Sequence, residues 1–473
     1  MGTIRRVVKN FLSVSFAEVI LRCITFLVIV YLARILAPAN FGKIGFAQAV
    51  VAYFLLPVNL GLTVLGVREV ARDKDNIDNY ASNIVTLRLM LALFSFCSLL
   101  VLVTFIRQSY EVKYLIVIYG LTLFSSALLT EWLFQGIEKM QFMGIARVLD
   151  KLLYGVLIFL LVRSSKELLF IPYLWLAGSL VGTGFLIFVF VKRFGKLRLR
   201  FNFSFWKSLM RRALPMGAAA IMIQIYYNFD VVMLGFIKGD KVVGWYSAAY
   251  KLILLVWGFI PIFVNAVFPL MSRYYKESQE KLRTLISLAT RLLSTVALPI
   301  GIGGTILARP IMGFFYGEKF NPGIIGFQIL IWSVVIILIR CIYEQSFLAC
   351  NLEKRFMWGV SLGALTNIGL NIILIPYFGL KGAAVATVIS EFVFSAYLLS
   401  YFRVMSRIRI MSYSLKPLVA AALMGLVVYY ARNLNLGLSI SLGILTYSIL
   451  IILLKGVTLG EMARLKEEIL AKR

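Results

Sequence analysis

The sequence predicts an all-helical protein that crosses a membrane many times. Hydrophobic residues make up 61% of the 473 residues, and charged residues only 15%. A soluble globular protein is about half apolar and about a quarter charged. Apolar runs of about 20 residues, the length of a membrane-spanning helix, recur along the whole chain. This pattern excludes a disordered chain and a soluble enzyme with one buried core.

The apolar runs give the expected spans in order. Two of them, 148–162 and 415–430, are short, so we expect between twelve and fourteen transmembrane helices. The runs cover residues 11–36, 44–66, 81–106, 114–135, 148–162, 168–191, 213–237, 242–271, 285–307, 323–350, 356–375, 382–402, 415–430 and 436–454.

The basic residues predict the orientation of these spans. With the amino terminus in the cytoplasm, 32 of the 49 Lys and Arg residues, including Arg147 and Lys151, fall in cytoplasmic segments, and 12 fall in the opposite loops. Cytoplasmic loops of membrane proteins carry such an excess. We therefore expect a multi-pass protein of the plasma or inner membrane with both termini in the cytoplasm. Because the basic residues are spread over short loops, the net charge of +28 does not indicate nucleic-acid binding.

Two basic segments are expected at the membrane surface. Residues 192–212 carry eight cations, no acid and four aromatic residues, which is typical of a connector that lies on anionic headgroups. The tail 458–473 has apolar residues at helical spacing and is expected to lie along the cytoplasmic surface.

The two halves of the chain resemble each other. Gly42 and Gly244 each follow a short outer loop, and Pro57 and Pro261 each lie within the span that follows. Repeats with an even number of spans are related by an axis along the membrane normal. The prolines suit either a bend that lines a cavity or a packed structural kink.

Charged residues inside the spans are the candidate functional residues, because an ionised side chain at bilayer depth costs about 2.5–3.5 kcal/mol on insertion scales. The candidate cations for substrate binding are Arg22, Lys251, Arg88, Arg291 and Arg340, and the candidate coupling or structural acids are Asp230, Glu18, Glu344 and Glu391.

Structural roles are open for most of these residues. Glu18 with Arg22, and Arg340 with Glu344, are four residues apart, so each pair can form an ion pair within one helix. Arg88, Arg291 and Glu131 lie near predicted cytoplasmic ends and are expected to snorkel to the surface.

Arg22 and Lys251 are the strongest candidates for function. They occupy spans of the two halves and are expected to present positive charge to a cavity that accepts a pyrophosphate or another polyanion. Asp230 is expected to pair with Lys251 or to carry a proton or Na⁺. A purely structural ion pair is the alternative.

No motif indicates an enzyme or a metal protein. The chain has no histidine, and its four cysteines lie in apolar stretches, so we expect no metal site and no cofactor. We find no hydrolase elbow, phosphate-binding P-loop or dinucleotide-binding glycine pattern. Any work is therefore expected to come from the substrate or from a gradient, with H⁺ or Na⁺ as possible coupling ions.

Two stretches resemble a known family. The segment YLARILAPANFGKIGFAQAV with NLGLTVLGVREVAR, and the segment that begins NFDVVMLGFIKGDKVVGWYSAAYKLILL, resemble polysaccharide-unit flippases of the O-antigen type in the multidrug/oligosaccharidyl-lipid/polysaccharide exporter superfamily. In the related lipid II flippase an arginine stands where Lys251 stands here. Lysine keeps the charge but lacks the arginine fork that binds phosphate in a bidentate way.

The resemblance implies a fold and an activity. The fold would have two pseudo-symmetric six-helix bundles (1–191 and 213–403) around a V-shaped central cavity. The bundles would be joined by the linker 192–212 and followed by two further helices and the tail (404–473). The activity would be movement of a polyprenyl-pyrophosphate-linked oligosaccharide to the outer leaflet by alternating access. Membrane lipids would be partners, and polysaccharide polymerase or assembly proteins are further candidate partners. A multidrug exporter and a flippase for the lipid II-type peptidoglycan precursor are the alternatives.

Overall fold

A computed structural model describes residues 2–258, 260–406 and 410–456, with side chains described from residue 20 onward except in short stretches near 215–225, 262–266 and 402–412. The described part of the chain contains helices and connecting segments and no strand, as predicted. The chain divides into two compact units, Met1–Gly244 and Trp245–Arg473. This division differs from the predicted domains, which remain a prediction.

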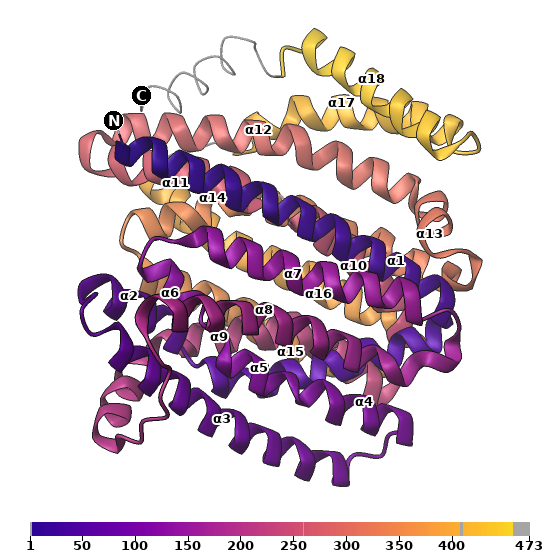
Figure 1. Cartoon of the computed structure of the whole chain (residues 1–473). Coiled ribbons are helices and arrows are strands. Elements are labelled where there is room, and N and C mark those ends of the chain that lie inside the picture. Colours follow the sequence, from indigo (N-terminus) through magenta and orange to yellow (C-terminus); the bar gives the residue numbers. More distant parts are fainter. Residues whose placement is uncertain (1, 259, 407–409, 457–473) are drawn as a thin grey trace. The chain divides into compact units, whose positions relative to one another are not determined.

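The first unit contains the helices of the amino-terminal half of the chain (Figure 1). They are α1 (Gly2–Asn59), α2 (Leu62–Arg72), α3 (Ile77–Phe105), α4 (Tyr110–Gly120), α5 (Thr122–Leu128), α6 (Glu131–Gly136), α7 (Met140–Leu161), η1 (Ser165–Phe170), α8 (Ile171–Phe194) and α9 (Phe203–Ile237). Helix α10 (Asp240–Trp257) begins in this unit and continues into the second one.

Helix α1 holds two predicted spans joined at a break. Ala37 has φ 59° and ψ 170°, and Pro38 follows it without a backbone N–H. The second segment ends at Asn59, and Gly61 takes a left-handed conformation before α2 begins. The predicted run 44–66 is therefore interrupted, because Pro57 removes one helical hydrogen bond and Gly61 turns the chain.

Helices α2, α3, α6, α8 and α9 pack around a shared apolar core in the first unit. Leu65 of α2, Ile84 of α3, Trp132 of α6 and Phe190 of α8 are all fully or almost fully buried in it. Trp206 of α9 also lies in this core, 7% exposed.

The predicted linker 192–212 is helical at both ends, and its position at the membrane surface remains a prediction. Residues 203–212 belong to α9, and the preceding segment bonds to α3. The backbone N–H groups of Arg198 and Arg200 donate to the hydroxyls of Ser82 and Thr86 at 3.3 and 3.1 Å.

The second unit contains the remaining helices. They are α11 (Ile260–Glu277), α12 (Gln279–Ile306), α13 (Ala308–Tyr316), η2 (Glu318–Gly323), α14 (Ile324–Ala349), α15 (Glu353–Phe378), α16 (Leu380–Ser406), α17 (Ile410–Ala431) and α18 (Leu436–Leu453). Helix α12 packs on α14 and α17, α16 packs on α14 and α15, and α17 packs on α18 (Figure 1). The predicted tail helix 458–473 lies outside the described residues.

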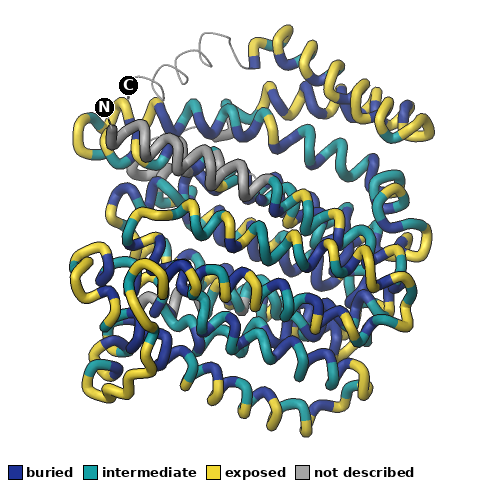
Figure 2. The backbone as a smooth tube through the Cα atoms, viewed as in Figure 1, coloured by how far each residue is buried: buried dark blue, intermediate teal, exposed yellow. Residues whose placement is uncertain are grey.

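Many helices carry exposed residues along one side (Figure 2). Many of these residues are large and apolar, as expected for contact with lipid. Phe94 of α3, Phe188 of α8, Trp358 of α15 and Leu445 of α18 are between 60% and 68% exposed. Ten helical segments among the described residues are long and apolar enough to cross a membrane, one of them Ile20–Arg72 with the break at Ala37 inside it. The protein is therefore a multi-pass membrane protein, and the count of fourteen stays a prediction.

Candidate functional site

Arg340 is the centre of a buried charge cluster in the second unit. Its guanidinium nitrogens lie 2.7 Å from a Glu344 oxygen on the same helix, α14, and 2.6 Å from a Glu391 oxygen on α16. The side chains of Arg340 and Glu391 are 4% and 0% exposed, and that of Glu344 is 21% exposed. The ring centroid of Phe394 is 4.0 Å from the guanidinium carbon. The ion pair that the sequence spacing allowed is present, and Glu391 adds a second carboxylate to it.

Arg88 is buried in the first unit and bonds the ends of two helices. Its guanidinium donates to the carbonyl oxygens of Ser126 at 2.6 Å, Leu129 at 2.9 Å and Val58 at 3.3 Å, and to the Asn59 side-chain oxygen at 2.7 Å. These acceptors lie near the carboxyl ends of α1 and α5, where the last carbonyls have no partner within the helix. Arg88 does not snorkel, because its side chain is 2% exposed inside these contacts. A contact between Arg88 and a substrate remains a prediction. The four bonds argue against it, because they already occupy the guanidinium.

Arg291 binds the chain just beyond the end of α18. Its guanidinium donates to the carbonyl oxygen of Gly456 and, at 3.0 Å, to that of Lys455. The Lys416 ammonium donates to the same Lys455 oxygen at 3.4 Å. Positive groups at a helix carboxyl end are favourable, because they bond the last carbonyls. These contacts give Arg291 a structural role, and a substrate contact for it remains a prediction.

Arg22 and Lys251 are neither fully buried nor fully exposed. Arg22 lies in α1 of the first unit, and Lys251 lies in α10 within the second unit. The cavity that they were expected to share remains a prediction. The side chain of Glu18 lies outside the described residues, so its predicted ion pair with Arg22 is not described either.

Asp230 is a buried acid of α9 in the first unit. Its side chain is 2% exposed, and one of its oxygens accepts a hydrogen bond from the backbone N–H of Val231 at 2.9 Å. Its carboxylate also interacts electrostatically with Tyr53 of α1. The pairing of Asp230 with Lys251 stays a prediction.

The second unit contains a large apolar cavity of about 770 Å³. It is lined by residues of α10, α12, α13, α14, α17 and α18, among them Pro299, Gly303, Met424, Gly443 and Tyr447. None of the described residues that line it is charged. Its volume is in the range of ligand pockets, about 300–1,000 Å³. The cavity suits an apolar chain and does not suit an anion.

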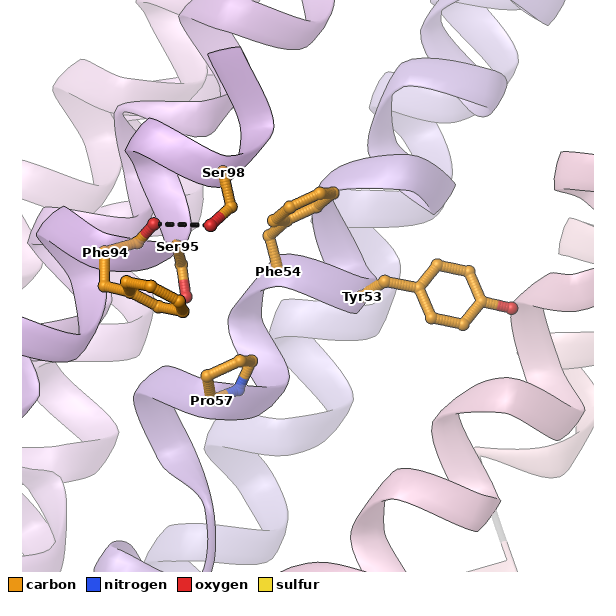
Figure 3. A pocket seen from close by; sticks show the side chains of 6 residues that line it. All are labelled: Tyr53, Phe54, Pro57, Phe94, Ser95 and Ser98. Atoms are coloured by element: carbon orange, nitrogen blue, oxygen red, sulfur yellow. Dashed lines mark hydrogen bonds between the residues drawn. The ribbon is translucent and has the colours of Figure 1, made fainter. Parts of the chain in front are cut away.

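A smaller cavity of about 190 Å³ lies between α1 and α3 in the first unit (Figure 3). Phe54 and Pro57 of α1 face Phe94 and Ser95 of α3, whereas the Tyr53 ring points away from them. The Ser98 hydroxyl, at the same cavity, donates to the Phe94 carbonyl oxygen at 2.9 Å. This cavity has no charged lining residue, so it is not a candidate site for a phosphate.

The sequence analysis did not identify the charged residues in the middle of α7 as candidate site residues. Lys151 was assigned to a cytoplasmic segment, and Asp150 was not considered. Both residues occupy the middle of α7, and Arg147 lies one turn before Lys151. The helix extends eight residues before the expected span 148–162, past Arg147, which marked the amino end of the apolar run. Arg147 forms a bidentate pair with Glu131 at 2.8 and 2.6 Å. Had the sequence analysis extended the expected helix back to Met140, these charges would have fallen near its middle.

The described residues contain no group of three or more His, Cys, Asp and Glu side chains arranged to hold a metal ion. Cys341 and Cys350 are buried, and Cys23 and Cys97 are exposed.

Comparison with known proteins gives a family match over more than half of the chain. Residues 7–275 match the family described as "Polysaccharide biosynthesis protein". A putative O-antigen transporter from Shigella dysenteriae is 26% identical over 371 residues, which are 77% of this chain and 92% of that protein. A probable low-salt glycan biosynthesis flippase from Haloferax volcanii is 26% identical over 238 residues, which are 49% of this chain and 48% of that protein.

The fold is also found in solved transporter structures. A lipid II flippase in an inward closed conformation superposes with a TM-score of 0.79 at 18% identity, covering 92% of this chain and 97% of that chain. An inward-facing multidrug resistance transporter of the MOP superfamily superposes with a TM-score of 0.63 at 17% identity, covering 82% and 94% of the two chains. At these identities the likeness concerns the fold, and it confirms the fold class predicted from the sequence.

Proposed function

The chain belongs to the polysaccharide biosynthesis protein family, and we propose that it moves a polyprenyl-pyrophosphate-linked oligosaccharide from the cytoplasmic to the outer leaflet of the cell membrane. The relatives described as O-antigen transporters and as a glycan flippase support this proposal. The task needs no bond to be made or broken. It needs a path on which a polar glycan crosses hydrocarbon without leaving its hydroxyls unpaired.

The apolar cavity of the second unit is the observation that carries the proposal. We assign it to the polyprenyl chain, because its 770 Å³ is lined mainly by apolar residues and by no described charge. A lipid tail is already in an apolar medium, so its transfer from the bilayer into the cavity removes little surface from water. Close packing against the lining residues would therefore favour its binding. Gly303 and Gly443 supply the room for that packing.

The pyrophosphate is assigned to the partly exposed cations Arg22 and Lys251. Cationic side chains form strong charge-assisted hydrogen bonds with phosphate oxygens. Arg88 is left out of this assignment, because its guanidinium is already bonded to four protein oxygens.

The Arg340 cluster is proposed as the coupling site. One guanidinium faces two carboxylates, so the three groups carry one excess negative charge in the interior of the second unit. A proton or Na⁺ would neutralise that excess, and the half-buried Glu344 is the more accessible of the two acids. The Glu344→Gln change is therefore expected to alter the dependence of transport on pH or Na⁺ without preventing folding.

The decisive experiment uses purified full-length protein in lipid vesicles that contain a polyprenyl-pyrophosphate-linked oligosaccharide. We expect the glycan to become accessible to an external glycosidase or lectin at a rate that empty vesicles do not show. A Gly303→Leu change should slow this movement by at least about tenfold, because its side chain would enter the apolar cavity. A Cβ at Gly303 meets only the flexible end of Met424, at 3.6 Å, so the variant is expected to fold.

The control is Gly313→Leu on the neighbouring helix α13, where an added Cβ meets no atom within 4 Å. Equal rates for vesicles with and without protein would contradict the proposal. Movement of lipid II in preference to other glycans would favour the peptidoglycan alternative. Drug resistance in cells that express the protein, without glycan movement, would favour the exporter alternative.

A further inference from the structure

Asp150, Lys151 and Trp175 form a polar and aromatic cluster between α7 and α8 in the first unit. The Lys151 ammonium lies 3.0 Å from an Asp150 carboxylate oxygen and 4.2 Å from the centroid of a Trp175 ring. Tyr154 packs edge-on against Trp175 with ring centroids 5.1 Å apart. The side chains of Asp150 and Lys151 are 22% and 24% exposed, so part of the cluster remains accessible.

The accessible part of the cluster does not face lipid. The exposed apolar residues of α7, such as Ile145, Leu152 and Val156, follow a helical stripe along one face. Lys151 is on the opposite side of the helix, at the spacing of the buried residues Tyr154 and Ile158. The pair therefore lies off the exposed apolar stripe of this 22-residue helix, which agrees with the high cost of exposing charge to hydrocarbon.

Helix packing fixes the Asp150 carboxylate in place. A Cβ on Gly178 of α8 would lie 2.6 Å from the Asp150 carbonyl oxygen and 2.9 Å from its Oδ1. The glycine therefore lets α8 approach the carboxylate without covering it with a side chain. Asp150 Oδ1 is buried and has no hydrogen-bond partner in the part of the chain that the structure describes. Because Oδ1 is covered by α8, the accessible part of the Asp150 side chain lies on the side of Oδ2, the oxygen that pairs with Lys151.

We propose that Asp150, Lys151 and Trp175 form a sugar-binding subsite that holds one ring of the transported glycan. This inference rests on the proposed function and adds the part of the cargo that the first unit recognises. A sugar ring takes the place of Lys151 on the Trp175 ring face, Oδ2 of Asp150 accepts from a sugar hydroxyl, and the Lys151 ammonium donates to another.

The charges of the cluster favour a sugar over the pyrophosphate. Asp150 and Lys151 cancel each other, so the subsite carries no net charge to attract an anion. The contact between Lys151 and the Trp175 ring is weak at a partly exposed position, so a sugar ring can replace it.

Equilibrium binding to the full-length protein in nanodiscs tests this subsite with two probes. The first is the polyprenyl-pyrophosphate oligosaccharide fraction extracted from membranes of the source cells, and the second is undecaprenyl pyrophosphate without sugar. Trp175→Leu should weaken binding of the first probe by about tenfold, the loss expected for one aromatic contact. Binding of the sugar-free probe should stay within about twofold. Asp150→Asn should change the two probes in the same unequal way, and Trp175→Phe should restore most of the binding.

The matched control is Trp358→Leu, which removes a tryptophan that is 68% exposed on α15. Equal weakening of both probes by Trp175→Leu and Asp150→Asn would show a structural role and overturn the subsite. Unchanged binding of the glycan probe in both variants would overturn it as well. If the wild type moves the glycan in vesicles but the variants do not discriminate, this inference fails alone. If the wild type binds neither probe, the proposed function and the subsite both fail.

Discussion

Within the first unit, Gly42 of α1 lies against the backbone of α10, and Gly244 of α10 lies against the backbone of α1. A Cβ on Gly42 would lie 1.8 Å from the carbonyl oxygen of Asp240, and a Cβ on Gly244 would lie 1.8 Å from that of Pro38. Each of these oxygens belongs to the residue four positions before the other glycine. The two glycines that mark corresponding places in the sequence halves therefore share one contact between α1 and α10.

Gly42→Ala and Gly244→Ala should each destabilise the protein. Any side chain at either position would collide with backbone, which cannot rotate away, so the helices must separate. Overpacking of this kind costs about 1–3 kcal/mol. The melting temperature of the purified protein should fall for both variants. Gly313→Ala, with no atom within 4 Å of an added Cβ, should leave the temperature unchanged. Wild-type melting of Gly42→Ala would show that this approach is not tight.

Arg88→Met should lower stability more than any substitution of an exposed arginine. The change leaves four oxygens near the ends of α1 and α5 without their donor, and each hydrogen bond to a charged group contributes about 1.5–3 kcal/mol. Arg88→Lys should rescue only part of the loss, because an ammonium cannot fork across these acceptors.

The measurement for Arg88 is the amount of folded protein extracted from membranes together with its melting temperature. Arg107→Met, in the exposed segment after α3, is the control. A melting temperature for Arg88→Met equal to that of the control would contradict the structural role of Arg88.

Glu391→Leu should destabilise the second unit by about 3–5 kcal/mol, because it leaves Arg340 buried with one of its two carboxylate partners. The double change Arg340→Leu and Glu391→Leu should be closer to the wild type, since it removes both buried charges. A double-mutant cycle measured by thermal unfolding gives the coupling. The exposed pair of Arg273 and Glu277 is the control, and its coupling should stay below about 1 kcal/mol. Additive single changes at Arg340 and Glu391 would disprove the coupling.

Trp206→Ala should destabilise the first unit, although the surrounding segment is among the most basic of the chain. Its ring is 7% exposed in the apolar core, and truncation of a buried tryptophan costs about 3–5 kcal/mol. Leu199→Ala, at a position that is 62% exposed, is the control and should melt with the wild type. If Trp206→Ala changed only the binding of the protein to anionic lipid, the segment would lie on the membrane surface and not in the core.

Prediction from sequence succeeded where a property depends on the local chain. The apolar runs identified most of the spanning helices, because a backbone in hydrocarbon must satisfy its hydrogen bonds within a helix. The pair of Arg340 and Glu344 followed from the spacing of side chains on one helix. The family resemblance rested on short stretches that the family match confirms.

The sequence analysis differs from the structure where charged residues lie inside a long helix. The expected span began at 148, after Arg147, whereas the helix begins at Met140, and it holds Asp150 and Lys151 in its middle. The structure keeps these charges inside the helix because they pair with each other and with Trp175. Trp206 was placed at the membrane surface by its basic neighbours, whereas the ring itself is buried.

The sequence by itself determined the membrane class, the helical architecture and the family, since these depend on hydropathy, helical period and local motifs. The tertiary structure alone decided which distant groups meet: Glu391 with Arg340, four oxygens with Arg88, and Trp175 with Lys151. Such partners lie tens of residues apart, and no periodicity along the chain encodes which of several charged side chains a buried group will find. Burial in a low-dielectric interior then makes each of these pairings energetically decisive.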